Sequence, residues 1–366
     1  MKIKYPVYQP SLHGKEKQYV DDCITSTWIS SKGKYISKFE EEFSNFLDIK
    51  YSAAVSNGTV ALHVALLSLG IGPGDEVIVP TFTYIASVNA IHYTGATPVF
   101  VDSEDEFWLM DIEKIKKRIT EKTKAIMAVH LYGQMCDMNG LINICKANNL
   151  FLVEDCAEAF GSKYYKNYAG TFGDVSTFSF FGNKTITTGE GGMVCCNSEQ
   201  LYEKIVKIKG QGLAKGKEYF HDIIGYNYRM TNICAAIGCA QLENAKSIIK
   251  KKRQIAEWYN NRLMKLPLSV PKERPDTVNT YWMYTILLND YSKRDDFRTY
   301  LKERGIETRP GFHPVHSMPM YFKAEYKFPI ADKLGQHAVN LPSYPDLCEE
   351  DVHTICREIK RFFDEN

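Results

Sequence analysis

Apolar runs of β-strand type alternate with helical patterns from about residue 52 onward, and this alternation limits the possible folds most. The clearest apolar runs are residues 76–79, 97–101, 125–129 and 150–153, and the clearest helical segments between them are 59–69 and 138–148. Strands that alternate with helices favour a mainly parallel sheet with helices on both faces. Ligands of such sheets bind beyond the carboxyl ends of the strands. Asp102, His130 and Asp155 follow such ends, although His130 fits a packing role equally well.

The pattern changes in the last third of the chain. A long helical stretch at 232–265 is followed by closely spaced prolines, a Tyr/Trp-rich strand at 280–288, and helices at 293–304 and 349–363. A chain of 366 residues favours about two domains. We therefore predict an α/β protein with a large domain at residues 1–245 and a smaller C-terminal α+β domain at 246–366.

Composition argues against several classes of protein. The net charge is +1, from 45 basic and 44 acidic residues, which gives no support for a nucleic-acid binder. We expect no membrane span, because no stretch reaches about 18 uninterrupted apolar residues. The basic run Lys250–Arg253 falls in a helical pattern and predicts a solvated helix face.

The ten cysteines form no C-x-x-C pair, and no secretory signal is expected in residues 1–10. Reduced thiols and a cytoplasmic location are the simplest expectation.

Two segments offer a phosphate site and a buried carboxylate. Ser56, Asn57, Gly58 and Thr59 form a small polar loop before a helical segment, where free N–H groups and the helix dipole favour a phosphate. Ser and Thr at such a place are also ordinary helix caps. Asp155 ends an apolar run, where a carboxylate is costly unless paired. The protonated ring nitrogen of pyridoxal phosphate would pair with it; capping the next helix is the alternative.

Lys184 stands alone between an aromatic strand, residues 176–181, and a glycine-rich turn, residues 189–192. Glycines allow the backbone to pass close to a ligand. Apolar surroundings lower the pKa of a lysine, which makes its amine usable for Schiff-base formation. A lone lysine is normally a surface residue, so this assignment depends on the neighbouring motifs.

Long segments in one order resemble a known family. They are VSNGTVALHVAL from Val55, GDEVIVPTFTYIASVNAI from Gly74, EDCAEAFGS from Glu154, SFFGNKTITTGEGGM from Ser179, GYNYRMTNICAAIG from Gly225 and ETRPGFHPVHSMPMY from Glu307. Together they are similar to the DegT/DnrJ/EryC1/StrS sugar aminotransferases, which are pyridoxal-phosphate enzymes of fold type I. The N-terminal strings YQPSLHGKEKQYV and TWISSKGKYI are most similar to the perosamine synthases of that family, which aminate C4 of a nucleotide-linked 4-keto-6-deoxy sugar.

The resemblance implies a role for each matching residue. Lys184 would hold the cofactor aldehyde and move the proton, and Asp155 would pair with the ring nitrogen. Glu158 would face the ring hydroxyl, where many relatives have Gln, and Tyr84 would stack on the ring. The remaining implied contacts are with the phosphate: Gly58, Thr59 and Ser179 from the same chain, and Asn227 from the second subunit of a homodimer.

Sugar contacts are more open. Arg309 and His316 lie in a segment that borders the substrate cleft in relatives, but either residue also fits a structural role. The N-terminal candidates for the nucleotide-sugar pocket are Tyr8, Trp28, Ser30 and Ser31.

The resemblance implies transfer of an amino group from glutamate to the sugar. GDP-4-keto-6-deoxymannose would lead to perosamine, and UDP- or dTDP-4-keto-6-deoxyglucose would lead to viosamine. A sugar dehydratase is a second possibility, but such relatives carry His at the position of Lys184. A regulatory protein is a third, and the chain lacks room before Ser56 for a helix-turn-helix module.

Overall fold

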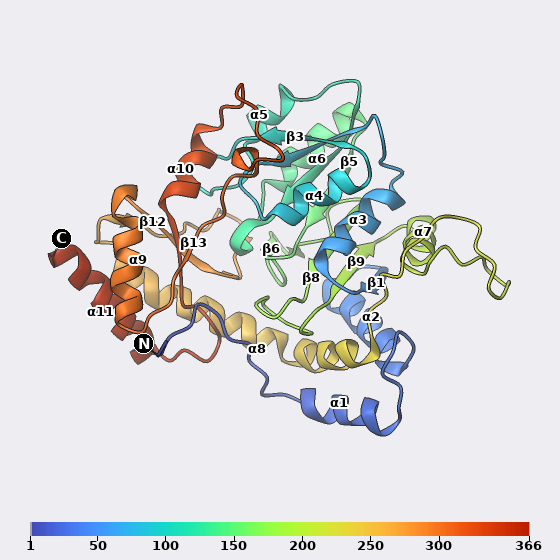
Figure 1. Ribbon diagram of the computed structural model, residues 1–366, viewed down its shortest axis with the longest axis horizontal. Helices are drawn as coiled ribbons and strands as arrows, with labels where there is room; N and C mark the ends of the chain where they lie inside the picture. The colour runs from blue at the N-terminus through green and yellow to red at the C-terminus, as the bar shows by residue number, and fades with distance from the viewer. Residues whose placement is uncertain (1, 366) are drawn as a thin grey trace.

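The structure, a computed structural model, describes residues 2–365 and is built around a seven-stranded sheet (Figure 1). Its strands lie in the order β1-β9-β8-β5-β4-β2-β3. They are β1 (Tyr51–Val55), β2 (Glu76–Pro80), β3 (Thr97–Val101), β4 (Thr123–Val129), β5 (Phe151–Asp155), β8 (Val175–Ser179) and β9 (Gly192–Cys196). All neighbours pair in parallel except β9, which is antiparallel to both β1 and β8. The predicted mainly parallel sheet is confirmed.

Helices that precede, connect or follow the strands cover this sheet. They are α2 (Lys34–Leu47), α3 (Gly58–Ser68), α4 (Ile85–Tyr93), α5 (Ile112–Lys116), α6 (Met138–Asn148) and α7 (Glu199–Lys209). The expected helices at 59–69 and 138–148 are α3 and α6. Helix α3 packs on β8 and β9 on one side and on α4 and α7 on others, so seven of its eleven residues are buried. Its N-terminus is therefore held rigidly at the edge of the sheet.

An aromatic cluster anchors the strand that leads to Lys184. The ring of Phe43 packs edge-on against Phe178 and Phe180, at 5.0 and 5.5 Å between ring centroids. Phe39 lies 5.2 Å from Phe180, and Phe160 lies 5.7 Å from Phe43. Side chains of a strand alternate between its two faces, so burial of Phe178 and Phe180 turns Ser179 toward the opposite face.

A second, antiparallel sheet lies in the C-terminal part. Its strands are β10 (Leu268–Ser269), β12 (Tyr284–Leu288), β14 (Ala338–Leu341) and β13 (Arg309–Pro310), in that order. Helices α9 (Arg294–Glu303) and α11 (Glu349–Glu365) belong to this part, and the long helix α8 (Asn232–Leu263) leads into it. The helices expected at 232–265, 293–304 and 349–363 are confirmed. The strand expected at 280–288 begins only at Tyr284.

The remaining elements are small. A third sheet joins β11 (Thr277–Val278), β6 (Lys163–Tyr164) and β7 (Asn167–Tyr168). The other helices are α1 (Glu16–Thr25) and α10 (Pro329–His337), and short 3-10 turns occupy Leu131–Gly133, Tyr291–Lys293 and Val315–Ser317.

Two hydrophobic cores meet along α8. The larger core includes Ile248, and the smaller one begins at Ile255. The N-terminal Tyr5 packs in the smaller core, whereas Val315 and Leu334 pack in the larger one. Each core therefore includes residues from both predicted domains, and the division between residues 245 and 246 stays a prediction.

The predicted solvated face of α8 is wrong at Lys252, which is only 1 % exposed. Lys252 follows the buried Ile248 by four residues and precedes Ile255 by three, so it falls on the buried stripe of the helix. Its Nζ donates to the backbone carbonyl of Ser343 at 2.6 Å. Burial lowers the pKa of Lys252 to about 7.

All ten cysteines are free thiols, and eight of them are buried. Within residues 2–365, no helix is long and apolar enough to cross a membrane.

Candidate active site

A cavity of about 650 Å³ lies beyond the carboxyl ends of the parallel strands, which is a volume typical of small-molecule sites. Its walls come from the large sheet, from the turn after β8, from the segment just before β12, and from β13 and β14 of the smaller sheet. Eight of the residues predicted from the sequence line it: Gly58, Thr59, Tyr84, Asp155, Glu158, Ser179, Lys184 and Arg309.

Close backbone packing shapes one end of the cavity. The register pairs Gly192 of β9 with both Val55 and Ser179, which brings the loop before α3 against the end of β8. A Cβ atom on Gly58 would lie 2.7 Å from the Cβ of Ser179, so only glycine fits there. Asn57 caps α3 by accepting from the Val60 amide at 3.0 Å. The free amides of the first helical turn are left as donors for an anion.

Asp155 ends β5 inside the cavity and is only 4 % exposed. Its Oδ2 accepts from the Ser87 hydroxyl at 2.7 Å, and its Oδ1 accepts from the Ala157 amide at 3.1 Å. Burial raises the pKa of Asp155, while these hydrogen bonds and the charge of Lys184 oppose the rise. A buried carboxylate held in this way favours a cation at the cavity.

Lys184 follows the turn after β8, and its side chain is 12 % exposed. The Nζ atom lies 3.7 Å from Glu158 Oε1 and 3.8 Å from the centroid of the Trp282 ring. Burial lowers the pKa of Lys184, against the opposing charges of Glu158 and Asp155. A lowered pKa leaves more of the amine unprotonated, as a nucleophile or a base requires.

Glu158 is buried three residues beyond Asp155. Its Oε2 accepts from the backbone N–H of Tyr132 at 2.8 Å. Burial raises the pKa of Glu158 to about 7, and the charge of Lys184 opposes this rise. The carboxyl of Glu158 therefore changes charge in the neutral pH range beside the amine of Lys184.

Aromatic rings form the wall opposite these charges. Tyr84 precedes α4, is 55 % exposed at the cavity, and lies 5.6 Å from Phe312 between ring centroids. Behind them, Tyr132 stacks on Phe312 at 5.6 Å and on Trp282 at 6.3 Å. A flat ring fits between such a wall and the strand ends.

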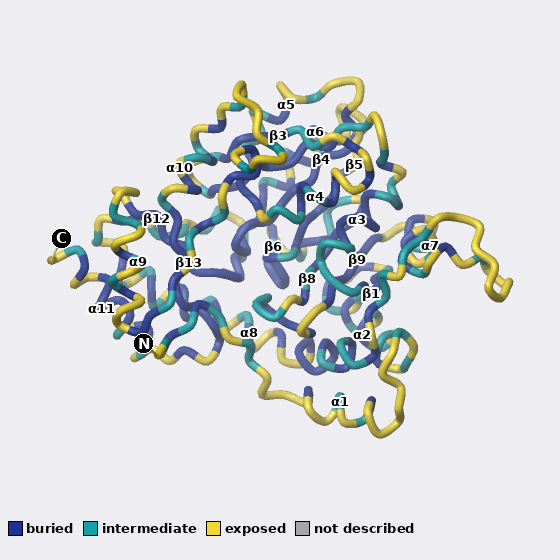
Figure 2. The backbone as a smooth tube through the Cα atoms, in the orientation of Figure 1, coloured by how far each residue is buried: buried dark blue, intermediate teal, exposed yellow. Residues whose placement is uncertain are grey.

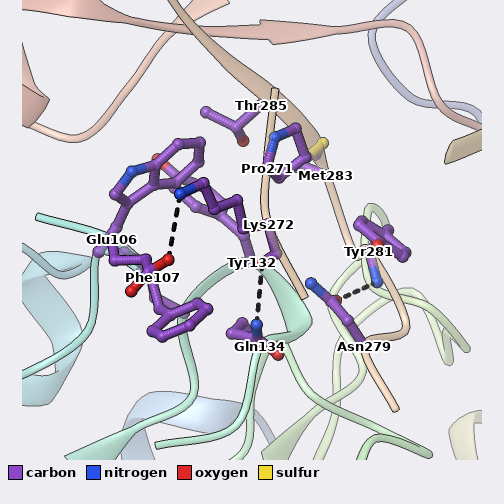
Figure 3. A pocket seen from close by; sticks show the side chains of 12 residues that line it. Glu106, Phe107, Tyr132, Gln134, Pro271, Lys272, Asn279, Tyr281, Met283 and Thr285 are labelled. Atoms are coloured by element: carbon purple, nitrogen blue, oxygen red, sulfur yellow. Dashed lines mark hydrogen bonds and ion pairs between the residues drawn. The ribbon is translucent and has the colours of Figure 1, made fainter. Parts of the chain in front are cut away.

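A second and much smaller cavity, of about 20 Å³, is lined by Tyr132, Met283 and ten other residues (Figure 3). It has room for about one water molecule. The ion pair of Lys272 with Glu106 and the hydrogen bond from Gln134 to the Lys272 carbonyl lie beside it. Of these two cavities, the larger one has room for a cofactor and a sugar.

Six predicted site residues do not line the larger cavity of their own chain: Tyr8, Trp28, Ser30, Ser31, Asn227 and His316. His316 is buried between Thr81, at 2.8 Å from its Nδ1, and Asp332, at 3.2 Å from its Nε2. This arrangement fits the structural alternative. The hydroxyl of Tyr8 donates instead to the backbone carbonyl of Lys184.

The N-terminal candidates lie on the surface near the start of α8. Asn232 donates its side-chain amide to the Trp28 carbonyl at 2.7 Å, and its backbone N–H to the Ser30 carbonyl at 2.7 Å. Trp28 remains 56 % exposed. Asn227 is also exposed, and its Oδ1 accepts from the guanidinium of Arg229 at 3.1 Å.

Sequence reasoning missed several cavity residues. Ser87, which binds Asp155, lies one helical turn beyond Tyr84, a spacing that could have indicated it. Trp282, Phe312 and Asn340 come from the C-terminal part, and their nearness to Lys184 follows from tertiary packing alone.

His130 is fully buried and serves the core. Its Nε2 lies 3.0 Å from Glu154 Oε2, and its Nδ1 accepts from the Cys136 amide at 3.2 Å. Glu154 also accepts three backbone amides, from Gly170, Phe172 and Gly173. Together with Cys156, these two side chains are close enough to share a metal ion, but the hydrogen bonds of His130 and Glu154 already give them a structural role in the core.

The residues present fit pyridoxal phosphate. The helix terminus with Gly58, Thr59 and Ser179 suits a phosphate, Asp155 suits a protonated ring nitrogen, and Lys184 suits an aldehyde. A mainly parallel sheet with this constellation at its carboxyl edge defines a pyridoxal-phosphate-dependent enzyme of fold type I.

Comparison with known proteins gives the family. The sequence pattern of the DegT/DnrJ/EryC1/StrS aminotransferase family matches residues 10–360. The chain is 60 % identical over 362 residues to the GDP-perosamine synthase of Escherichia coli O157:H7, covering 99 % of each chain. It is 53 % identical over 362 residues to that of Vibrio cholerae, covering 98 % of this chain and 99 % of the other.

Among solved structures, the aminotransferase TlmJ from Streptoalloteichus hindustanus matches with a TM-score of 0.94 at 29 % identity, covering 99 % of each chain. The chain belongs to the DegT/DnrJ/EryC1/StrS aminotransferase family. It is an aminotransferase whose cofactor is pyridoxal phosphate.

We predict that Glu158→Gln changes how stability depends on pH in the cofactor-free protein. The folded-state pKa of Glu158 is raised from 4.5 to about 7, so ionised Glu158 destabilises the fold as pH rises from 4.5 to 7. The Gln variant lacks this loss. Its advantage in unfolding free energy should grow across that window to on the order of 1–3 kcal/mol and stay constant above it. Denaturant unfolding at several pH values measures this. Parallel curves for the two proteins would contradict the assignment.

We predict that Asp155→Asn binds the cofactor but turns over about a hundredfold more slowly or worse, a loss of roughly 3 kcal/mol. A neutral amide cannot balance a positive charge on the ring nitrogen. Cofactor content is measured by absorbance, and turnover by amine production. Asp137→Asn is the matched control, because Asp137 accepts from the Gly140 amide at a helix start outside the cavity. Near-normal turnover of Asp155→Asn would show that Asp155 only accepts hydrogen bonds.

Proposed function

We propose that the protein transfers the amino group of glutamate to C4 of GDP-4-keto-6-deoxymannose and so forms GDP-perosamine. The observation that carries this proposal is the 60 % identity, over 99 % of both chains, to a GDP-perosamine synthase. The site agrees with it, because the cavity extends past Lys184 to Arg309 and Asn340 at the smaller sheet, where a sugar has room. The free thiols fit the cytoplasm as the proposed location.

In this proposal, pyridoxal phosphate supplies the electron sink when bound. Gly58, Thr59 and Ser179 hold its phosphate, and Asp155 keeps its ring nitrogen protonated. Tyr84 covers the ring. Lys184 would hold the cofactor aldehyde, and its amine would be the group that moves the proton during the transfer.

Glu158 supports the amine of Lys184 through this cycle. Its carboxyl lies 3.7 Å from Nζ, and its pKa of about 7 allows either charge state near neutral pH. As a carboxylate it stabilises a protonated Lys184, and as an acid it leaves the amine free. A Gln at this position would keep the hydrogen bond from Tyr132 but could not change charge.

The substrate is tested by supplying three nucleotide sugars with glutamate as donor. They are GDP-4-keto-6-deoxymannose and the UDP and dTDP forms of 4-keto-6-deoxyglucose. We expect kcat/KM to be highest for the GDP substrate, with an amine as product. A preference for a UDP or dTDP substrate would point to viosamine synthesis instead, and a 3-deoxy product without an amine would point to a dehydratase.

We further propose that the active unit is a homodimer with shared sites. The cavity of one chain has Lys184 and Arg309 as its only lysine or arginine among the described residues, and neither lies at the Gly58 end assigned to the phosphate. A dianion there needs further donors. Asn227 is exposed and Arg229 is partly exposed, and neither residue lines the cavity of its own chain.

Exposed apolar side chains also favour a second copy as partner. The segment after α7 projects from the rest of the molecule (Figures 1 and 2), and Tyr219 and Ile224 on it are 94 % and 88 % exposed. Trp28 and Ile29 are exposed near the start of α8. Apolar groups left open in this way are typical of a subunit interface. In this arrangement Trp28, Ser30 and Ser31 reach the partner's substrate pocket.

Complementation tests the shared site. We expect that mixing inactive Lys184→Ala with inactive Asn227→Asp, and allowing the subunits to exchange, restores activity. Each mixed dimer would have one intact site and one doubly damaged site, so recovery should approach about a quarter of wild-type activity at equal mixing. No recovery, with exchange verified by mass-tagged subunits, would mean that Asn227 acts within its own chain.

A further inference from the structure

The main chain on both sides of the Lys184 side chain is held by residues far away in sequence. The peptide carbonyl before it, of Asn183, accepts from the indole N–H of Trp282 at 2.7 Å. The carbonyl after it, of Lys184 itself, accepts from the Tyr8 hydroxyl at 2.5 Å. These two peptide planes define φ and ψ of Lys184, and therefore the direction in which its side chain leaves the backbone.

Tyr8 is itself held in place by its neighbours. The amide of Val7 donates to Glu307 Oε2 at 2.9 Å, and its carbonyl accepts from the Ser343 amide at 3.2 Å. The ring of Tyr8 lies against Lys252, whose Nζ is 5.3 Å from the ring centroid. That Nζ donates to the Ser343 carbonyl. Ser343 therefore holds both the residue before Tyr8 and the lysine that lies against the Tyr8 ring.

Burying the amine of Lys252 costs free energy, and its contacts with neighbouring residues explain why it is there. It is 1 % exposed, it has no carboxylate partner among residues 2–365, and burial lowers its pKa to about 7. Replacing such a residue by an apolar one would ordinarily stabilise a core. An apolar residue could not donate to the Ser343 carbonyl or place a cation against the Tyr8 ring, as Lys252 does.

We propose that Tyr8 is a positioning residue for Lys184: supported by Lys252 and Ser343, its hydroxyl fixes the peptide after Lys184 and so sets the angle of the Lys184 amine in the cavity. The sequence predicts that Tyr8 contacts the substrate. In this proposal it contacts the main chain of the reactive lysine instead. The proposal goes beyond the proposed function, and it depends on Lys184 being the cofactor lysine.

The test compares Tyr8→Phe and Lys252→Met with the wild-type holoenzyme. Tyr8→Phe removes only the hydroxyl, so we expect bound cofactor, kcat lower by about tenfold, and KM for the sugar nucleotide changed less than about twofold. The pH midpoint of the cofactor absorbance should also shift, because that midpoint reports the angle and surroundings of the Lys184 amine. Lys252→Met should change kcat and the midpoint in the same direction, by less.

Tyr321→Phe is the matched control, because it removes a hydroxyl that donates to Asn89 at 2.8 Å outside the cavity. Tyr321→Phe should leave kcat and the pH midpoint of the cofactor absorbance unchanged. A lower melting temperature of Tyr8→Phe with kcat and midpoint at wild-type values would overturn the proposal, and so would a raised KM at unchanged kcat. If Tyr8→Phe does not fold, Lys252→Met at wild-type kcat and midpoint overturns it. A borohydride-reduced cofactor adduct on another lysine of Lys184→Ala would instead refute the lysine assignment of the proposed function.

Discussion

The burial of three ionisable groups in one cavity is the constraint on which the rest of the site depends. Asp155, Glu158 and Lys184 are each costly in a dry interior, and each changes the pKa of the others. Asp155 accepts hydrogen bonds from Ser87 and the Ala157 amide, but no cation among the described residues forms an ion pair with it. A cofactor with a protonated ring nitrogen would supply that cation, so the electrostatics of these residues agree with the chemistry of pyridoxal phosphate.

The scaffold keeps these groups apart at fixed distances. Asp155 is carried by β5, and Lys184 by the turn after β8, and these strands are neighbours in the sheet. The aromatic cluster around Phe43 packs against Phe178 of β8, while Ser87 and the Ala157 amide donate hydrogen bonds to the carboxylate of Asp155. The antiparallel strand β9 places Gly192 between the loop before α3 and Ser179. Strand ends, and the turns and helix starts that closely follow them, set the geometry of most of the site.

Much of this arrangement could be predicted from the sequence, because its signals are local. The order of apolar runs predicts the parallel strands, and Gly58, Asp155 and Lys184 stand at their ends within short motifs. Trp282, Phe312 and Asn340 could not be found in this way, since only tertiary packing brings them to the cavity. The run of four basic residues predicts a solvated helix face, but the helical spacing places Lys252 on the buried stripe of α8. Contacts that lie between subunits leave no local signal, which is why Asn227 rests on family resemblance.

The central claim is that Lys184, and no other lysine, holds the cofactor. Lys252 makes this a sharp question, because it is also buried and its pKa is lowered to about 7. Reduction of the holoenzyme with borohydride followed by peptide mapping answers it. The account predicts one labelled peptide, which contains Lys184. A label on Lys252 or on any other lysine would contradict it.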